Sequence, residues 1–211
     1  MPADGSTLEP ELLSSELHPA RPGSWSPDGN ELIVATLAGD ILALPIDGEQ
    51  EPHIVIGTEY RENAPRLSPD GRWLAYSSNV TGGVEIWVRP YPGPGAPVRM
   101  TSSGGDDPVW SRDGRELFYV EGQRGTPDVR LMGVRVETTP EFRFEPPQVL
   151  VDGGFATSSR FSGAYDVASD GRFVMIKSSA PQATDAQSLP DQLTVVTHWF
   201  EELNRLVPTE N

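Results

Sequence analysis

The sequence predicts an all-β fold: a β-propeller of about four blades, each of four antiparallel strands, in a partial or unusually small ring with a short C-terminal helix. Three observations support this prediction. One short pattern recurs four times along the 211 residues, and an apolar strand follows each copy. The 21 glycines and 21 prolines also fall between short apolar runs rather than in one tract, as is typical of an all-β protein.

The recurring pattern is a Ser-Pro-Asp-Gly turn and its variants. Its Asp-Gly pairs begin at residues 28, 70, 113 and 170, so successive copies lie 42, 43 and 57 residues apart. The first two intervals match a propeller blade of about 40–45 residues, and the third contains an insertion. In such a turn Pro presets φ, Asp bonds its own backbone and Gly accepts a positive φ. Arg112 and Ser169 replace Pro in the last two copies, which keep the Asp-Gly pair. We therefore assign the four aspartates to turn structure rather than to a metal site.

Strands are expected at regular places around each turn. The strands directly after the turns are 31–35, 72–77, 116–121 and 172–177, and the next strands are 40–45, 84–89, 128–136 and 193–200. A weaker third run occurs at 53–56, 97–100 and 148–151. Counting the stretch before each turn, the first three units have four strands each.

These units define a single propeller module over residues 1–211, with blades at approximately 20–57, 60–103, 106–152 and 162–200. An N-terminal strand at 10–15 is available to close the last blade, and residues 200–207 have the apolar spacing of a short helix. Residues 178–191 are expected to be a mobile surface loop. Three closures remain open: an open arc, a compact four-bladed ring, or half of a ring completed by a second chain.

Composition excludes several classes of function. The chain has 16 basic and 31 acidic residues, a formal net charge of −15 that repels nucleic acid and anionic membranes. It has no cysteine, and no apolar stretch approaches the roughly 20 residues that span a bilayer. Residues 1–25 lack the apolar run of a signal peptide. We therefore expect no nucleic-acid partner, no membrane insertion and a cytoplasmic location as encoded, or a periplasmic or extracellular one for a fragment of a longer membrane-anchored protein.

No catalytic set is recognisable, and neither a cofactor nor a metal is expected. The three histidines, His18, His53 and His198, lie far apart and none has the spacing of metal ligands. There is no Gly-x-Ser-x-Gly elbow and no protein-kinase motif. The pair Asp106 and Asp107 offers carboxylates for Ca²⁺, but a solvated polar loop is the preferred interpretation.

A binding site is instead expected where the loops that enter the inner strands converge on the propeller axis. This mouth would take a protein partner or a small ligand, and the tryptophans are expected mainly to pack between blades. The candidate residues are Arg61, Glu62, Asn63, Asp106, Asp107, Ser162 and Tyr165.

The repeats resemble a known family. With the turns, strands such as Trp73-Leu-Ala-Tyr-Ser-Ser and Val84-Glu-Ile-Trp-Val make residues 10–200 similar to the WD40-like (PD40) repeats of TolB-type propellers. Further segments resemble propellers at the C-termini of some bacterial Ser/Thr protein kinases: Ile86-Trp-Val-Arg-Pro-Tyr-Pro-Gly, Pro108-Val-Trp-Ser, Arg115-Glu-Leu-Phe-Tyr and His198-Trp-Phe-Glu-Glu-Leu-Asn-Arg-Leu. Prolyl oligopeptidases carry similar repeats, and family propellers generally have more blades than the four found here.

The resemblance implies a non-catalytic propeller that recognises a protein or a ligand. Two alternatives remain open. The chain is a sensor or accessory propeller of a bacterial Ser/Thr kinase, or of a prolyl-oligopeptidase-like enzyme, without the catalytic domain. Alternatively, partial rings associate into a homo-oligomer that completes a propeller.

Overall fold

The computed structural model describes residues 19–46, 50–123, 126, 128–153, 155, 157, 163, 165–168 and 170–176. Every regular element within these residues is a β-strand, so the all-β prediction is confirmed. The predicted helix at 200–207, the closing strand at 10–15, the strand at 193–200 and the loop at 178–191 lie outside the described residues.

The first two repeat units each form a four-stranded antiparallel sheet whose strands follow chain order. The first sheet consists of β1 (Ala20–Trp25), β2 (Glu31–Thr36), β3 (Ile41–Pro45) and β4 (His53–Ile56). The second consists of β5 (Glu62–Leu67), β6 (Trp73–Ser78), β7 (Glu85–Pro90) and β8 (Val98–Arg99).

The third sheet is larger, and two short strands share its outer edge. Its inner part is β9 (Asp106–Trp110), β10 (Glu116–Gly122) and β11 (Val129–Glu137). One end of β11 pairs with β13 (Gln148–Asp152) and the other with β12 (Arg143–Phe144), a strand that the repeat pattern did not predict. The last described sheet is the antiparallel pair β14 (Tyr165–Val167) and β15 (Phe173–Met175).

Each Ser-x-Asp-Gly turn is held by the same side-chain hydrogen bonds. In the first copy the Ser26 hydroxyl donates to Asp28 Oδ1 over 2.6 Å and accepts from the Glu31 amide over 2.9 Å. The third copy repeats both bonds through Ser111, Asp113 and Glu116 at 2.7 and 2.9 Å. The serine hydroxyls lower the pKa of Asp28 and of Asp113. The turn role predicted for these aspartates is therefore confirmed.

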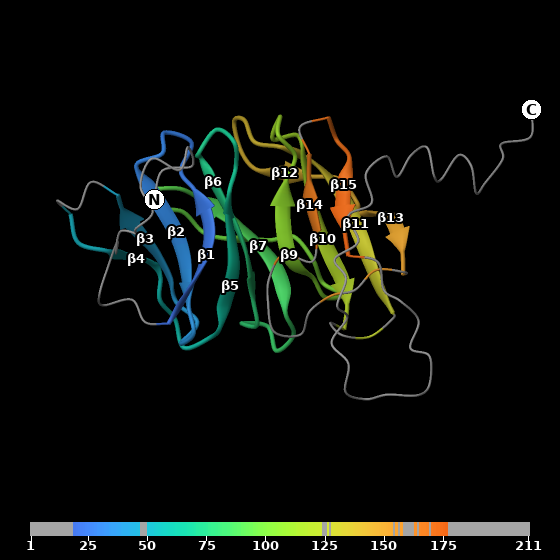
Figure 1. The fold of residues 1–211 in the computed structure, drawn as a ribbon, viewed down its shortest axis with the longest axis horizontal. Coiled ribbons are helices and arrows are strands. Elements are labelled where there is room, and N and C mark those ends of the chain that lie inside the picture. The colour runs from blue at the N-terminus through green and yellow to red at the C-terminus, as the bar shows by residue number, and fades with distance from the viewer. Residues whose placement is uncertain are drawn as a thin grey trace, which may run out of the picture.

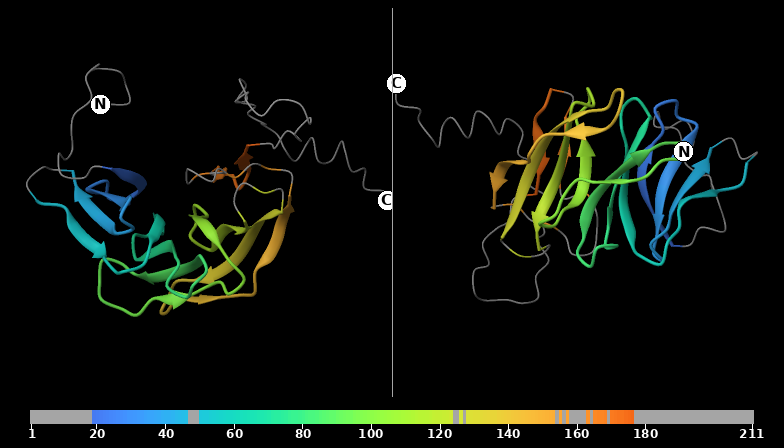
Figure 2. Two further views of the ribbon diagram at one scale, coloured as in Figure 1. Left: turned by 90° about the horizontal axis from the view of Figure 1, so that it is seen from below. Right: turned by 180° about the vertical axis from the view of Figure 1, so that it is seen from behind.

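The sheets follow one another around an arc, with the first sheet at one end and the β14–β15 pair at the other (Figure 2). The strands β1, β5, β9 and β14, which are the first of each sheet, run side by side across the molecule (Figure 1). We call these four the inner strands, because they lie nearest the axis of the arc.

Three hydrophobic cores lie between consecutive sheets. The first joins Ile33 and Ile41 of the first sheet to Leu74 of the second. The second core joins the second and third sheets, and the third packs the third sheet against Tyr165 and Phe173 of the last pair. Sheets stacked face to face in chain order bury the apolar face of each strand against the next blade.

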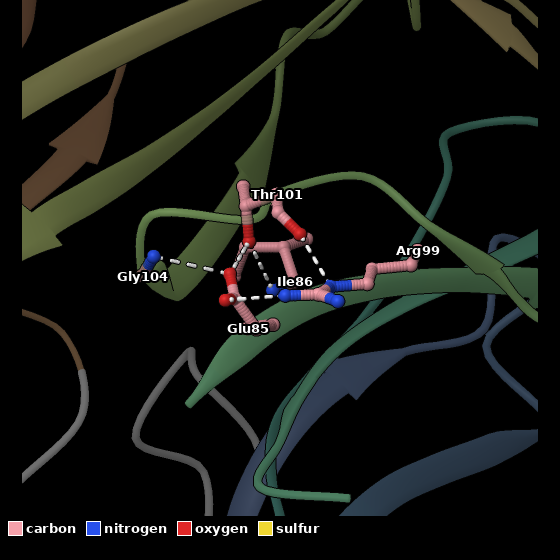
Figure 3. Close-up of polar contacts among 5 residues, drawn as sticks. All are labelled: Glu85, Ile86, Arg99, Thr101 and Gly104. Atoms are coloured by element: carbon pink, nitrogen blue, oxygen red, sulfur yellow. Dashed lines mark hydrogen bonds and ion pairs between the residues drawn. The ribbon is translucent and has the colours of Figure 1, made fainter. Parts of the chain in front are cut away.

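A buried carboxylate fixes the outer edge of the second sheet (Figure 3). Glu85, 4 % exposed, accepts hydrogen bonds from Arg99 Nη2 over 2.8 Å, from the Gly104 amide over 3.1 Å and from the Thr101 hydroxyl. The Thr101 hydroxyl oxygen in turn accepts from the Ile86 amide over 2.9 Å. Since the carboxylate is ion-paired and hydrogen-bonded, it joins β7 and β8 to the loop that leads into the third sheet.

Candidate functional site

The four inner strands line an open hollow of about 600 Å³. We call it the axial hollow. Ser24, Arg66, Val109 and Asp166 line it, one from each inner strand, and each stands two residues before the first residue of its turn. The turn residues Pro27, Pro69 and Arg112 line it as well. The hollow therefore lies at the turn end of the inner strands and is built from equivalent positions of the repeat.

Hydrogen bonds between neighbouring inner strands fix the walls of the axial hollow. The Leu67 amide donates to Ser24 Oγ over 2.8 Å, and Arg66 Nη1 donates to the Gly23 carbonyl oxygen. The Trp110 indole N–H donates to the Arg66 carbonyl oxygen over 3.0 Å. Each bond crosses from one sheet to the next, so the lining positions are held by the packing of the blades.

Trp25 and Trp110 occupy the same repeat position but have different surroundings. Trp110 packs in the core between the second and third sheets and is 8 % exposed, whereas Trp25 is 54 % exposed. Trp25 belongs to the first sheet, which has no preceding sheet among the described residues to pack against. Its indole ring therefore remains accessible at one end of the axial hollow.

Charge in the axial hollow comes from three lining side chains. Arg66 is half-buried, while Arg112 and Asp166 are exposed. The serines that line the hollow use their hydroxyls for structure: Ser24 accepts from Leu67, and Ser68 and Ser111 belong to turns. The hollow thus offers guanidinium groups and an indole ring for binding.

The predicted site residues lie mainly at the starts of the inner strands, opposite the turns. Arg61 is exposed and its amide donates to Asn79 Oδ1 over 2.8 Å. Glu62 is 2 % exposed; its Oε1 accepts from the Thr58 and Ser78 hydroxyls over 2.8 and 3.2 Å. The half-buried Asn63 accepts a bond at its carbonyl oxygen from the Ser77 hydroxyl, over 3.2 Å.

The other predicted residues belong to the junction of the third sheet with the last pair. The buried Tyr165 donates its hydroxyl to the Asp107 carbonyl oxygen over 2.8 Å, and the Gly163 amide donates to Asp107 Oδ2 over 3.3 Å. Asp106 Oδ1 accepts from the Asp107 amide over 2.8 Å. Burial raises the pKa of Tyr165 well above its ordinary value, and the Asp107 carboxylate raises it further. Ser162 lies outside the described residues.

The structure therefore brings together Asp106, Asp107 and Tyr165, and of the predicted set Tyr165 also lines the axial hollow. Backbone geometry contributes to this arrangement. Ala64 and Asp107, at equivalent places before a proline, have φ of 49° and 52°, and the pairing register shifts beside both. Such bulges bend a strand and redirect its side chains.

Sequence reasoning missed Trp25, Arg66 and Arg112 as lining residues. One signal was present in the sequence: the third copy of the turn has Arg112 where the first two have Pro27 and Pro69. An arginine does not preorganise a turn as a proline does, so turn geometry does not account for Arg112.

The fold was compared with those of known proteins. No family model matches the chain. A TolB-like protein from Agrobacterium tumefaciens has a similar structure, with a TM-score of 0.59 and 26% identity over 78% of this chain and 59% of that one. The chain has a β-propeller fold. The strands, turns and axial hollow described above are thus parts of propeller blades.

Two relatives are similar in sequence. An uncharacterised protein of Agrobacterium fabrum is 36% identical over 90 residues, which are 41% of this chain and 29% of that protein. Tricorn protease homolog 1 of Streptomyces coelicolor is 30% identical over 159 residues, which are 74% of this chain and 13% of that protein. The chain thus spans less than a third of either relative. Among the described residues, no helix is long and apolar enough to cross a membrane.

Proposed function

We propose that this propeller is a non-catalytic module that binds a protein partner or a ligand in the axial hollow. The observation that carries the proposal is the hollow itself, which places Trp25, Arg66 and Arg112 around one concavity. Its volume of about 600 Å³ falls within the range of roughly 300–1,000 Å³ for ligand sites. An accessible indole and arginine side chains are also the groups that most often anchor protein partners.

The polar groups around the hollow support binding rather than catalysis. A nucleophilic serine needs a base within hydrogen-bond reach, but the hydroxyls of Ser68 and Ser111 each bond an aspartate and a backbone amide of their own turn. His53, the histidine within the described residues, is exposed on β4, the strand farthest from β1 in its sheet.

The test is to map binding by nuclear magnetic resonance on the ¹⁵N-labelled protein, using a panel of short peptides. The proposal expects shifts at the Trp25 indole N–H and at the Arg66 and Leu67 amides, and unchanged signals at the outer strand β4. Mass spectrometry of the recovered peptides should find them intact. Cleaved peptides, or shifts confined to β4, would contradict the proposal.

A second candidate function is supported by the similarity to the tricorn protease homolog, a protein much longer than this chain. In this proposal the propeller is an accessory domain of a larger enzyme of the peptidase type. A sensor propeller of a Ser/Thr kinase is the variant suggested by the repeat sequences. The coding region around this chain decides whether a catalytic domain is attached, and the full product is then assayed for peptidase and kinase activity.

Within that second proposal, the propeller contributes regulation or selection rather than chemistry. Substitution of Trp25 by Ala should then alter the response to large substrates or effectors and leave turnover of a minimal substrate unchanged. Equal loss of turnover on both substrates would count against an accessory role.

A further inference from the structure

The axial hollow differs in charge from the rest of the chain. The protein has almost twice as many acidic as basic residues, yet two arginines and one aspartate line the hollow. Arg66 and Arg112 reach it from the second and third sheets, and Asp166 from the last pair. A concave surface of locally positive charge within a strongly acidic protein attracts anions.

Arg112 is not required by the turn in which it stands. The equivalent residues of the first two copies are Pro27 and Pro69, and all three line the hollow. The hydrogen bonds of the third turn are the same as those of the first, so the turn forms without proline. The Arg112 side chain is exposed and makes no hydrogen bond or ion pair within the described residues. Its guanidinium is therefore available to a ligand.

Arg66 is fixed in position by its neighbours. Arg66 Nη1 donates to the Gly23 carbonyl oxygen across the junction of the first two sheets. The Trp110 indole N–H donates to the backbone carbonyl oxygen of Arg66. The remaining N–H groups make no hydrogen bond within the described part of the chain. A half-buried guanidinium loses little side-chain entropy on binding and is weakly hydrated, so it suits pairing with a carboxylate.

We propose that the axial hollow binds an acidic peptide segment, with a carboxylate held by Arg66 and Arg112. This inference rests on the proposed binding function and specifies its ligand. The lining extends over the inner strands of consecutive blades, which suits an extended chain rather than a single small anion. Asp166 also lines the hollow and repels acidic groups, so the two arginines are the lining side chains that attract a carboxylate. A nucleic-acid backbone binds through many phosphate contacts, whereas the hollow offers two arginines, which argues against nucleic acid.

The experiment measures binding by calorimetry at low salt with three probes: a short acetylated glutamate-rich peptide, the matching glutamine peptide, and inorganic phosphate. The glutamate peptide should bind about tenfold more tightly than the glutamine peptide, because charge-assisted hydrogen bonds are lost with the carboxylates. Phosphate should bind far more weakly than the glutamate peptide. Added salt should weaken binding of the glutamate peptide.

Two variants test whether Arg112 binds the carboxylate. Arg112→Pro restores the residue that the first two repeats have, so the turn should fold, while affinity for the glutamate peptide should fall about tenfold. The control is Arg115→Ala, which removes an exposed arginine in the same turn segment and should leave affinity unchanged. Circular dichroism and the unfolding midpoint check that both variants are folded.

Several results would overturn the inference. Equal affinity for the glutamate and glutamine peptides would show that charge does not select the ligand, yet would leave the proposed binding function standing. Phosphate binding as tight as the glutamate peptide would indicate a small-anion site. Unchanged affinity in Arg112→Pro would exclude that arginine. Absence of binding by the glutamate peptide would overturn the acidic-ligand inference. Peptide-panel shifts confined to β4 would in addition reject the proposed function itself.

Discussion

Removal of the Glu85 carboxylate tests how the blades are joined. We expect Glu85→Ala to reduce the free energy of unfolding by about 3 kcal/mol. The side chain of Glu85 is 5% exposed, and the substitution leaves the Thr101 hydroxyl and the Gly104 amide without an acceptor, at about 1–2 kcal/mol each. Arg99 contributes less, because its side chain is 37% exposed and water replaces its partner.

Arg99→Ala is the matched comparison, because it removes one donor and keeps the Glu85 carboxylate. That variant should cost about 1 kcal/mol, since Glu85 keeps two of its three donors. Urea unfolding followed by circular dichroism measures both variants, and Glu137→Ala, on an exposed position of β11, should change stability by less than about 0.5 kcal/mol. A cost below about 1 kcal/mol for Glu85→Ala, or a larger cost for Arg99→Ala, would refute the account.

Three further predictions concern packing and pH. Gly23→Ala should lower the free energy of unfolding in urea by about 1–3 kcal/mol, because the new Cβ would lie 2.5 Å from the Pro65 carbonyl oxygen. Gly83→Ala is the matched control, since a Cβ there meets nothing within 4 Å. Equal losses of stability in the two variants would contradict the close packing at Gly23. In acid, the lowered pKa of Asp113 means that its stabilisation is present above the unfolded value of 3.8 and is lost as pH falls through its lower folded value. Ser111→Ala should therefore reduce the difference between unfolding midpoints at about pH 5 and about pH 3, and an unchanged difference would contradict this role. In alkali, burial raises the pKa of Tyr76 and of Tyr119 to about 12. The stabilisation from these two neutral tyrosines is therefore complete below pH 10.0 and is lost as pH rises toward 12. A spectroscopic phenolate titration of the folded protein in which every tyrosine ionises near pH 10 would disprove these raised pKa values.

The sequence predicted the fold because local chemistry repeats. Each Asp-Gly turn is fixed by bonds within about five residues, so its role was readable without tertiary information, and strands such as Glu31–Thr36 and Gln148–Asp152 follow from alternation and flanking turns. The short strand Arg143–Phe144 was missed, because two residues carry no periodic signal.

The candidate site was harder to predict, because it depends on contacts between blades. The sequence placed binding residues at the starts of the inner strands, since the loops there converge in propellers. It could not show that Glu62 is buried against Ser78, or that Arg66 reaches the carbonyl of a residue 43 positions away. The sequence shows that Arg112 replaces a proline. Only the structure shows that the Arg112 side chain lines the axial hollow together with Arg66.

The three interblade cores connect each described sheet only to its neighbours in the chain, so the sheets form a linear series. The first and last sheets each contribute to one core, whereas the second and third sheets each contribute to the cores on both of their faces. In such a nearest-neighbour system, strain introduced in one unit is felt in the next and decays with each further unit. The core shared by the second and third sheets therefore couples the two halves of the arc. Weaker packing in this core would let Arg66 and Arg112 move independently of each other. The hydrogen bonds within the turn next to each arginine would keep the shape of that turn.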